Sequence, residues 1–154
     1  MTFNIRHAKE NDYEQVERIM KQVHALHTQW RPDIYKDVET VLPKDRYMDH
    51  VNRNEVLVAE KEENQIVGIL IYVTKMISGG PMMERKVLYM DSMAVDEPYR
   101  GQGIGHKFFD FVKTICKEEN YDGLELQVNA KNSAAMEMYE KYGFTKKSIN
   151  MELL

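Results

Sequence analysis

The feature that most constrains the fold is an apolar run followed by three closely spaced glycines and an amphipathic segment. Residues 87–95 are apolar at nearly every position, which is typical of a strand covered on both faces. Gly101, Gly103 and Gly105 come next, and apolar residues then recur at helical spacing as far as Cys116. This pattern predicts a strand, a glycine loop and a helix in direct succession, and therefore a mixed α/β fold.

Further elements are predicted on both sides of this unit. The positions of apolar, Pro, Gly and Asn residues predict helices over residues 12–28, 43–54 and 132–142, and strands over residues 3–7, 55–60, 66–74, 124–128 and 144–152. Asn11 or Asp12 is expected to cap the first helix, with Glu14 and Gln15 placed for a capping box. No linker or repeat divides the sequence, so we expect a single domain over residues 1–154.

Composition argues against several classes of protein. The net charge is −4, so an overall basic footprint for nucleic acid is absent. No apolar run approaches the roughly 20 residues of a membrane span, and the N-terminus lacks the apolar core of a secretory signal. Because Cys116 is the only cysteine, neither an intramolecular disulfide nor a cysteine-based metal site is expected. We therefore expect a cytoplasmic protein without a bound metal.

The glycine loop is suited to bind a phosphate group. The first amides of a helix point outward without partners, at the positive end of the helix dipole, and Arg100 adds a full positive charge beside them. Glycines let a ligand approach the backbone closely. The spacing over residues 101–106 fits neither the Rossmann fingerprint nor a P-loop. A tight turn without a ligand is the alternative interpretation.

The residues in and around this loop resemble the GCN5-related N-acetyltransferase (GNAT) family. Arg100-x-x-Gly103-x-Gly105 is similar to the loop with which that family grips the pyrophosphate of acetyl-coenzyme A (acetyl-CoA). Residues 5–12 and 126–144 resemble its opening and closing segments, so the resemblance covers essentially the whole chain. It implies a central, mostly antiparallel mixed sheet of about six to seven strands, with splayed central strands and about four flanking helices.

The resemblance implies a binding site for acetyl-CoA as a cosubstrate. The main chain of the central strand is expected to pair with the pantetheine arm, and the loop amides are expected to bind the pyrophosphate. The expected coenzyme-binding residues are Met93, Ala94, Val95, Arg100, Gly101, Gln102, Gly103, Ile104, Gly105, Asn132, Ala135 and Tyr139. Asn132 is equally suited to cap the last helix.

The resemblance also implies that acetyl passes directly to an amine, without an acyl-enzyme. Tyr139 is expected to protonate the leaving thiolate, a role suited to a phenol with a pKa near 10. A buried, hydrogen-bonded tyrosine is the alternative. Asp91, acting through a water molecule, is the expected base, with a structural role as its alternative, and Glu84 is a weaker candidate. Strict alternation along the strand places Tyr89, Asp91 and Met93 on one face, and Leu88, Met90, Ser92 and Ala94 on the other.

The segment after the first helix is expected to contact the acceptor amine. It gathers His27, Trp30, Arg31 and Tyr35, which we expect to bind the substrate. Arg31 is suited to a carboxylate on the acceptor. The acidic residues that follow, Asp33, Asp37 and Glu39, would instead attract a polyamine or a basic peptide end. The sequence favours neither kind of acceptor.

The expected function is transfer of acetyl from acetyl-CoA to a primary amine. The acceptor would be a small molecule, a protein N-terminus or a lysine. A non-catalytic acyl-CoA-binding domain is the alternative. Dimerisation is common among the proteins it resembles, so a homodimer in which the last strand, residues 144–152, pairs across a two-fold axis is a further hypothesis.

Overall fold

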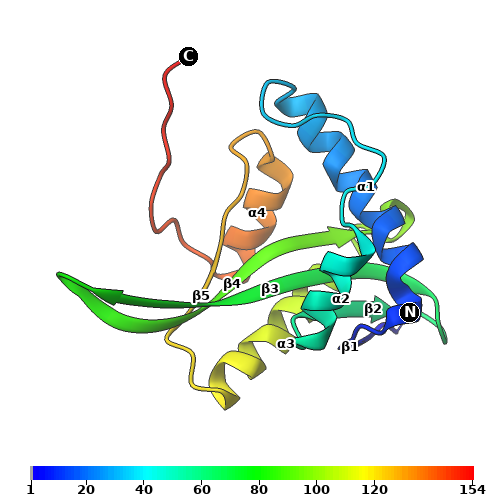
Figure 1. Ribbon diagram of the computed structural model, residues 1–154, viewed down its shortest axis with the longest axis horizontal. Helices are drawn as coiled ribbons and strands as arrows, with labels where there is room; N and C mark the ends of the chain where they lie inside the picture. The colour runs from blue at the N-terminus through cyan, green and yellow to red at the C-terminus, as the bar shows by residue number, and fades with distance from the viewer. Residues whose placement is uncertain (1) are drawn as a thin grey trace.

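The computed structural model describes residues 2–154, which form a five-stranded sheet with helices on both faces (Figure 1). The strands are β1 (Asn4–His7), β2 (Val56–Glu60), β3 (Ile66–Gly79), β4 (Met82–Val95) and β5 (Gly123–Leu126). The helices are α1 (Tyr13–Trp30), α2 (Lys44–Asn52), α3 (Ile104–Glu118) and α4 (Ser133–Tyr142), with short 3-10 helices η1 (Glu10–Asp12) and η2 (Glu97–Tyr99). None of the helices within residues 2–154 is long and apolar enough to cross a bilayer.

The sheet is antiparallel except at one edge. Its order is β1-β2-β3-β4-β5, and only the pairing of β4 with β5 is parallel. The strand that precedes the glycine loop therefore lies next to the strand that follows α3, as expected for a strand–helix–strand unit. The predicted mostly antiparallel mixed sheet with four helices is confirmed.

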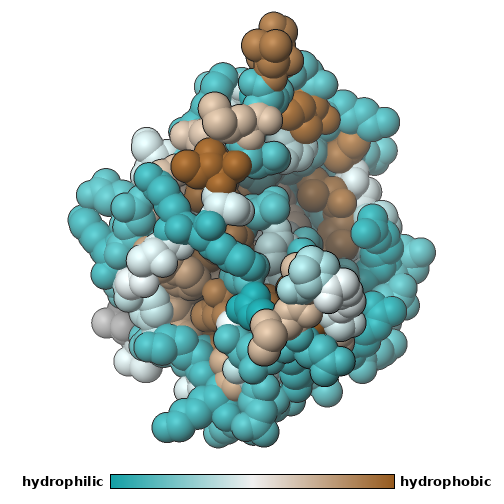
Figure 2. Space-filling model, turned by 90° about the vertical axis from the view of Figure 1, so that its left-hand side faces the viewer, coloured by the Kyte–Doolittle hydropathy of each residue, from teal (hydrophilic) through white to brown (hydrophobic). Residues whose placement is uncertain are grey.

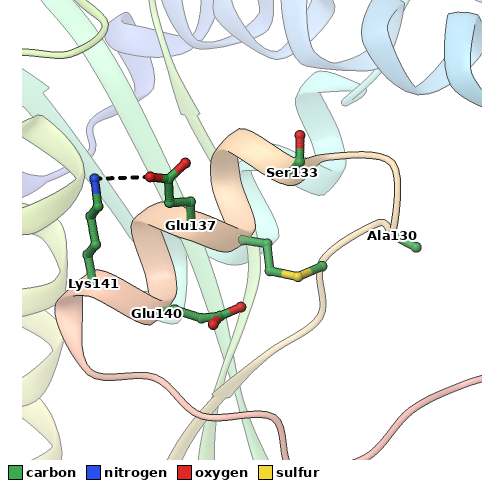
Figure 3. Close-up of a pocket in the computed structure, with 6 residues that line it drawn as sticks. Ala130, Ser133, Glu137, Glu140 and Lys141 are labelled. Carbon is green, nitrogen blue, oxygen red and sulfur yellow. Dashed lines mark ion pairs between the residues drawn. The ribbon is translucent and has the colours of Figure 1, made fainter.

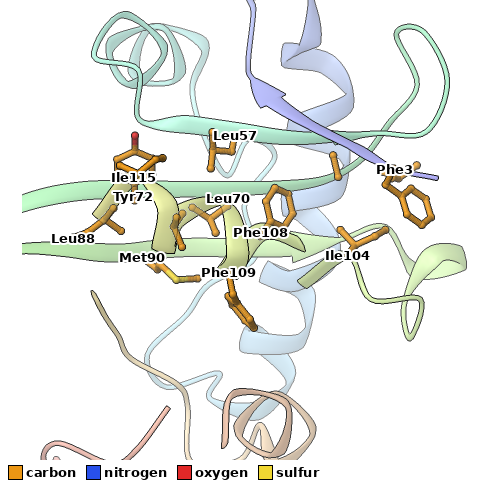
Figure 4. Close-up of a cluster of buried hydrophobic side chains, with 13 residues drawn as sticks. Phe3, Leu57, Leu70, Tyr72, Leu88, Met90, Ile104, Phe108, Phe109 and Ile115 are labelled. Atoms are coloured by element: carbon orange, nitrogen blue, oxygen red, sulfur yellow. The ribbon is translucent and has the colours of Figure 1, made fainter. Parts of the chain in front are cut away.

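Two hydrophobic cores lie on opposite faces of the sheet. Leu57, Leu70 and Leu88 pack on one face against Phe108 and Phe109 of α3, as Figure 4 shows. On the other face, the alternate residues of the same strands pack against α1 and α2, and this second core includes Val58, Ile69, Ile71, Val16, Ile19 and Tyr47. Because side chains alternate along a strand, one sheet supplies both cores. Burial of each large apolar side chain contributes about 1.5–3 kcal/mol to folding.

The hairpin of β3 and β4 is longer than the sequence pattern predicts. The predicted strands cover residues 66–74 and 87–95, whereas the observed strands continue to Gly79 and start at Met82. The added residues form an arm that extends beyond the rest of the sheet (Figure 1). Gly79 and Gly80 close it with φ values of 101° and 56°, a region that favours glycine. The arm lacks the continuous apolar pattern of a buried strand, which is why it was missed.

The prediction of a last strand over residues 144–152 is wrong for this structure. The segment after α4 is extended but forms no strand, so the described sheet has five strands and not six or seven. Residues 145–154, here called the tail, are all exposed. An extended segment becomes a strand only when its backbone groups pair with a neighbour. Nothing within residues 2–154 provides that partner.

The predicted capping box at the start of α1 is also wrong. Asp12 stands at the N-cap, but its carboxylate does not cap the helix. It accepts hydrogen bonds from the Arg6 guanidinium at 2.8 and 3.0 Å and from the Lys9 amide at 2.8 Å. Gln15 instead accepts a hydrogen bond from the Ile66 amide. These side chains join α1 to the sheet and do not satisfy the helix's own amides.

Candidate active site

Strands β4 and β5 part at a bulge in β4. The last residues that pair between them are Met90 and Leu126. At the same place the pairing of β4 with β3 skips Asp91, because Ile71 faces Ser92 while the next β3 residue faces Met90. Within residues 2–154, β4 beyond Asp91 keeps only β3 as a neighbour, so its other edge is open. Bulges often lie next to active sites, where they redirect side chains.

The bulge reverses the alternation of side chains along β4. Met90 and Met93 both pack with the α3 core, whereas Ala94 packs with the α1 core. The predicted assignment of residues to faces is therefore wrong after Asp91. One extra residue shifts every following side chain to the other face. Asp91 itself is exposed at the point where the strands separate.

The open edge of β4 presents main-chain groups of two predicted coenzyme-binding residues. The Asp96 amide donates to the Val67 carbonyl at 2.9 Å, toward β3. Because main-chain groups alternate sides along a strand, those of Ala94 also face β3, and those of Met93 and Val95 face the open side. The Val95 carbonyl accepts a hydrogen bond from Arg100 Nε at 2.9 Å. The amides of Met93 and Val95 thus remain for an extended ligand beside β4.

The glycine loop gives α3 an uncapped N-terminus. Gly101 and Gly103 have φ values of 79° and 85°. Gly103 is the N-cap residue, no side chain caps the helix, and its first turn contains no acidic residue. The first backbone bond of the helix runs from the Lys107 amide to the Gly103 carbonyl at 3.1 Å. The preceding amides and the helix dipole therefore favour an anion here.

Gly105 has a packing role. A Cβ atom at this position would lie 3.1 Å from Sδ of Met138 and 3.6 Å from Cε of Met93. The absence of a side chain thus lets the start of α3 meet both α4 and the open part of β4. Gln102 is exposed and Ile104 is buried in the α3 core.

The loop is held in place by α1, which sequence reasoning missed. Gln22 accepts hydrogen bonds from the Glu97 amide at 3.0 Å and from Arg100 Nη2 at 3.2 Å. Arg18 forms an ion pair with buried Asp96 at 3.0 Å. The hydrogen bond from Arg18 is the main cause that lowers the pKa of Asp96. No local pattern could reveal these contacts, because the partners lie more than 70 residues apart in the sequence.

Tyr139 has a packed ring and a free hydroxyl. Its ring lies 5.7 Å from that of Phe109 and 5.8 Å from that of Phe144, between centroids. Within residues 2–154 the hydroxyl has no hydrogen-bond partner. Every fully buried side-chain polar atom in that range has a partner, so the Tyr139 hydroxyl is not fully buried and solvent reaches it. Burial raises the pKa of Tyr139 above its ordinary value of 10. The alternative of a hydrogen-bonded structural tyrosine finds no support.

The other predicted residues of α4 lie on one side of its first turn. The Asn132 side chain accepts a hydrogen bond from the Ala135 amide at 3.2 Å, so Asn132 is the N-cap of α4. Ala135 is half-buried, one helical turn before Tyr139. Met138 packs against the same core as Met93, which brings this helix to the open part of β4.

The predicted acceptor-binding residues form one aromatic cluster at the end of α1. The ring of His27 stacks on Tyr35 at 5.1 Å and lies 5.8 Å from Trp30. Burial, with a smaller effect of His24, lowers the pKa of His27. The Trp30 carbonyl accepts a hydrogen bond from Lys131, which precedes α4. The cluster and the loop before α4 therefore lie together.

Arg31 is occupied by carboxylates of the chain itself. Its guanidinium pairs with Asp33 at 2.7 Å and also with Glu152 of the tail. Two bound carboxylates satisfy its donors, which argues against the hypothesis that Arg31 holds a carboxylate of the acceptor. Neither Lys131 nor Glu152 was predicted as a neighbour of this cluster, because both contacts join distant parts of the sequence.

A surface hollow lies on α4, and its lining differs from the residues predicted to bind the coenzyme. Figure 3 shows that its lining comes from the helix and the loop before it: Ala130, Ser133, Met136, Glu137, Glu140 and Lys141. It includes none of the residues of the glycine loop or of the open edge of β4. An open strand edge lies along the surface of the sheet and does not form an enclosed cavity. Within residues 2–154 no cluster of His, Cys, Asp or Glu is placed to hold a metal ion.

Comparison with known families identifies the family of the chain. The family model described as "Acetyltransferase (GNAT) family" matches residues 20–144, a span that includes β2 through α4. The chain therefore belongs to the GNAT family of acetyltransferases, and the predicted fold is confirmed.

Individual relatives are similar over shorter spans or in fold. N-alpha-acetyltransferase 50 of Danio rerio is 38% identical over 61 residues, which are 39% of this chain and 36% of that protein. A putative [ribosomal protein bS18]-alanine N-acetyltransferase of Bacillus subtilis is 35% identical over 52 residues, or 34% of each chain. These matches span only about a third of either relative.

Solved structures match over the whole chain. A point mutant of the BH1408 protein from Bacillus halodurans has a TM-score of 0.94 and 32% identity, and the match covers 98% of both chains. The aminoglycoside N-acetyltransferase AAC(6')-Iy, solved in complex with CoA, has a TM-score of 0.68 at 11% identity, with coverage of 99% and 94%. The second similarity shows the fold alone.

The left-handed backbone at Gly103 leads to a prediction about coenzyme affinity. A Cβ in this region costs about 1–2 kcal/mol, so Gly103→Ala should distort the first turn of α3. We expect acetyl-CoA affinity to fall about tenfold, since tenfold corresponds to about 1.4 kcal/mol. Calorimetric titration measures it. Gly80→Ala, at a positive φ in the hairpin turn, is the control and should leave the affinity unchanged. Equal affinity of the Gly103 variant and the parent would contradict the assignment.

Proposed function

We propose that the chain transfers the acetyl group of acetyl-CoA to a primary amine in a ternary complex. The observation that carries the proposal is the junction of three features: the open edge of β4, the uncapped start of α3 and the free hydroxyl of Tyr139. The packing of Gly105 between Met93 and Met138 brings these three elements together. Membership of an acetyltransferase family and the CoA complex of a similar fold support this proposal.

Each part has a role that its geometry suits. The free amides of the loop and Arg100 bind the pyrophosphate, and the amides of Met93 and Val95 pair with the pantetheine arm. This places the thioester near the bulge, where the strands separate. Ala135 leaves room beside the arm. The Asn132 side-chain oxygen caps α4, while its amide nitrogen has no partner among residues 2–154. The Ala94 main chain pairs with β3, so Ala94 offers the coenzyme no main-chain hydrogen bond and only lines its binding site.

The chemical step is a direct attack. The nitrogen of the neutral amine bonds to the acetyl carbonyl carbon, and the carbon–sulfur bond breaks. Asp91 accepts, through water, the proton that the ammonium form of the acceptor loses before the attack. The thiolate takes its proton from Tyr139, and the proton that the nitrogen loses as the amide forms restores the Tyr139 hydroxyl. A raised pKa keeps Tyr139 protonated at neutral and mildly alkaline pH, which is the form that a donor requires. The solvent-exposed carboxylate of Asp91 suits a base that acts through water.

The acceptor binds near the aromatic cluster of His27, Trp30 and Tyr35. Because Arg31 is paired with Asp33 and Glu152, the exposed carboxylates around it favour a cationic acceptor over an anionic one. A protein N-terminus is supported by the relatives that are N-alpha-acetyltransferases. A polyamine or amino sugar has the same cationic chemistry. Release of free CoA thiol with peptides, polyamines and amino sugars in turn would separate these acceptors.

Replacement of Asp91 by asparagine tests its role as the base. Asp91→Asn removes the proton acceptor and keeps the size of the side chain, so kcat/KM should fall about 10²-fold at neutral pH. The loss should shrink as pH rises, because more of the amine is neutral without help. A pH profile of kcat/KM from pH 6 to pH 10 measures this. A uniform loss at every pH would indicate a structural role for Asp91.

A non-catalytic acyl-CoA-binding domain is the other outcome. Such a domain would bind acetyl-CoA in the titration and release no thiol with any of the amines. A chain that neither binds acetyl-CoA nor releases thiol would contradict both functions.

A further inference from the structure

Two acidic residues stand directly before the glycine loop. Asp96 and Glu97 lie between the end of β4 and Arg100. A carboxylate in contact with Arg100 would neutralise the positive charge that the loop offers to an anion, and it would also repel that anion. The loop can therefore bind an anion strongly only if these carboxylates do not pair with Arg100.

The carboxylate of Asp96 is occupied by side chains of α1, which passes the end of β4 (Figure 1). It is only 8% exposed, and it accepts hydrogen bonds from the two terminal nitrogens of Arg18 at 3.0 and 3.2 Å. Nε2 of Gln22 donates a third hydrogen bond at 2.8 Å. Because Arg18 lowers the pKa of Asp96, the carboxyl group is charged at neutral pH, and Arg18 compensates that charge.

The side-chain amide of Gln22 lies between Asp96 and Arg100. Its Nε2 donates to Asp96, while its Oε1 accepts from Nη2 of Arg100 at 3.2 Å and from the Glu97 amide at 3.0 Å. An amide can donate at one atom and accept at the other without a net charge, whereas a carboxylate can only accept. Gln22 thus links the two charged side chains through a neutral group.

Arg100 keeps its full positive charge in this arrangement. Its Nε donates to the Val95 carbonyl at 2.9 Å and its Nη2 donates to Gln22, so both partners are neutral. Within residues 2–154 Arg100 forms no ion pair. The side chain is exposed, and the two hydrogen bonds orient its guanidinium beside the loop.

The surface at this junction is polar. Eight large hydrophobic side chains are exposed within residues 2–154, and they lie on the tail, on the hairpin arm and at Ile34. Figure 2 views the side of the molecule that carries the tail and the arm, and it shows hydrophobic groups among hydrophilic ones there. None of the eight lies on α1, in the glycine loop or on α3. A ligand at the loop is therefore held there by charge and hydrogen bonds.

We propose that Gln22 is a positioning residue for the coenzyme, which orients Arg100 and keeps its charge available for the pyrophosphate. Gln22 acts through Arg100, which lies 78 residues further along the chain. Acetyl-CoA as the ligand rests on the proposed function. The role of Gln22 extends that function, because it makes a residue of α1 responsible for the preference for a donor that carries phosphates.

Gln22→Glu tests this role directly. The variant keeps the size of the side chain, but it replaces the Nε2 donor with an acceptor and adds a negative charge beside Arg100. The affinity for acetyl-CoA should fall about tenfold or more, because like charges brought together on binding cost several kcal/mol. Affinity for S-acetylpantetheine, which carries no phosphate, should stay unchanged. Calorimetric titration measures both affinities.

Two further variants accompany this measurement. Gln22→Ala removes the orienting hydrogen bonds without adding a charge, so the affinity for acetyl-CoA should fall about fivefold. Gln29→Glu makes the same chemical change at an exposed position of the same helix and should leave that affinity unchanged. Circular dichroism should show that each variant is folded.

An exchange of the two groups separates the placement of charge from a structural role. The double variant Gln22→Glu with Asp96→Asn has the same net charge as the parent and again pairs one amide with one carboxylate. The carboxylate now contacts Arg100, so the affinity for acetyl-CoA should stay as low as in Gln22→Glu alone. Recovery of the parent affinity by this exchange would overturn the proposed role of Gln22.

The remaining outcomes distinguish this role from the proposed function. A parent that binds acetyl-CoA and a Gln22→Glu variant that binds it equally well would overturn the role of Gln22 alone. Equal losses with acetyl-CoA and S-acetylpantetheine would also overturn it, because they would indicate a general disturbance of the site. A parent that does not bind acetyl-CoA would contradict both. Binding without release of thiol would contradict catalysis only, since a phosphate-dependent loss of affinity would still support the role of Gln22.

Discussion

Tyr139→Phe should lower kcat for acetyl transfer about 10²-fold or more and leave the affinity for acetyl-CoA unchanged. The size follows from the usual contribution of a general acid, which is about 10²–10⁴-fold. Only the hydroxyl is removed, and it has no hydrogen-bond partner within residues 2–154, so the packing of the ring against Phe109 and Phe144 is kept. Steady-state kinetics and calorimetry on one preparation measure the two quantities.

Tyr142→Phe is the matched control for this experiment. Tyr142 lies on the same helix and packs on the same Phe109, with 4.8 Å between ring centroids. Its hydroxyl is bound to Asp110 at 2.5 Å, and burial, with that hydrogen bond, raises the pKa of Tyr142 to about 12. We expect the Tyr142→Phe variant to have the same kcat as the parent. An equal kcat for Tyr139→Phe and the parent would remove Tyr139 as the acid.

Asp12→Ala should lower the free energy of unfolding by about 3 kcal/mol. The side chain of Asp12 is only 2% exposed and pairs with Arg6, which also pairs with Glu60 at 3.0 Å. Removal of one partner leaves the other charge partly buried without compensation, which typically costs about 3–5 kcal/mol. Urea unfolding measures the loss. Glu10→Gln breaks the exposed pair with Lys44 and should change the stability by less than about 1 kcal/mol.

The pH dependence of stability has a definite sign for this pair. Burial alone would raise the pKa of Asp12, but the hydrogen bonds from Arg6 and Lys9 outweigh burial and hold the pKa below its usual 3.8. A carboxyl whose pKa is lower in the folded state stabilises the fold above the unfolded value. The contribution is therefore complete at neutral pH and is lost as pH falls below about 4. The stability difference between parent and Asp12→Ala should shrink in acid, and a constant difference would contradict this account.

The glycine loop was predictable because its signals are local. Gly101 and Gly103 are needed for positive φ, and strand, loop and helix follow one another directly in the sequence. The cap at Asn132 and the C-terminal glycine of α4, Gly143 with φ of 124°, are local in the same way. The family resemblance added the predicted role of Tyr139 as the acid, which no spacing could supply.

Features that depend on distant contacts were not predictable. The bulge at Asp91 arises from the register of β3 against β4, and the sequence of β4 alone suggests strict alternation. In the sequence, Arg18 and Gln22 have the pattern of ordinary polar residues of a helix, although their hydrogen bonds hold the glycine loop in place. The predicted last strand over residues 144–152 fails for the same reason, because pairing requires a neighbour that residues 2–154 do not contain.

The most direct test of the central claim is a two-substrate kinetic analysis with the best acceptor amine from the panel. The double-reciprocal lines should intersect, because both substrates are bound when acetyl is transferred. Mass spectrometry should find acetyl on the amine and none on Cys116, whose pKa is raised by burial and which is therefore a poor nucleophile. Parallel lines with an acetylated enzyme, or no acetyl on any amine, would contradict it.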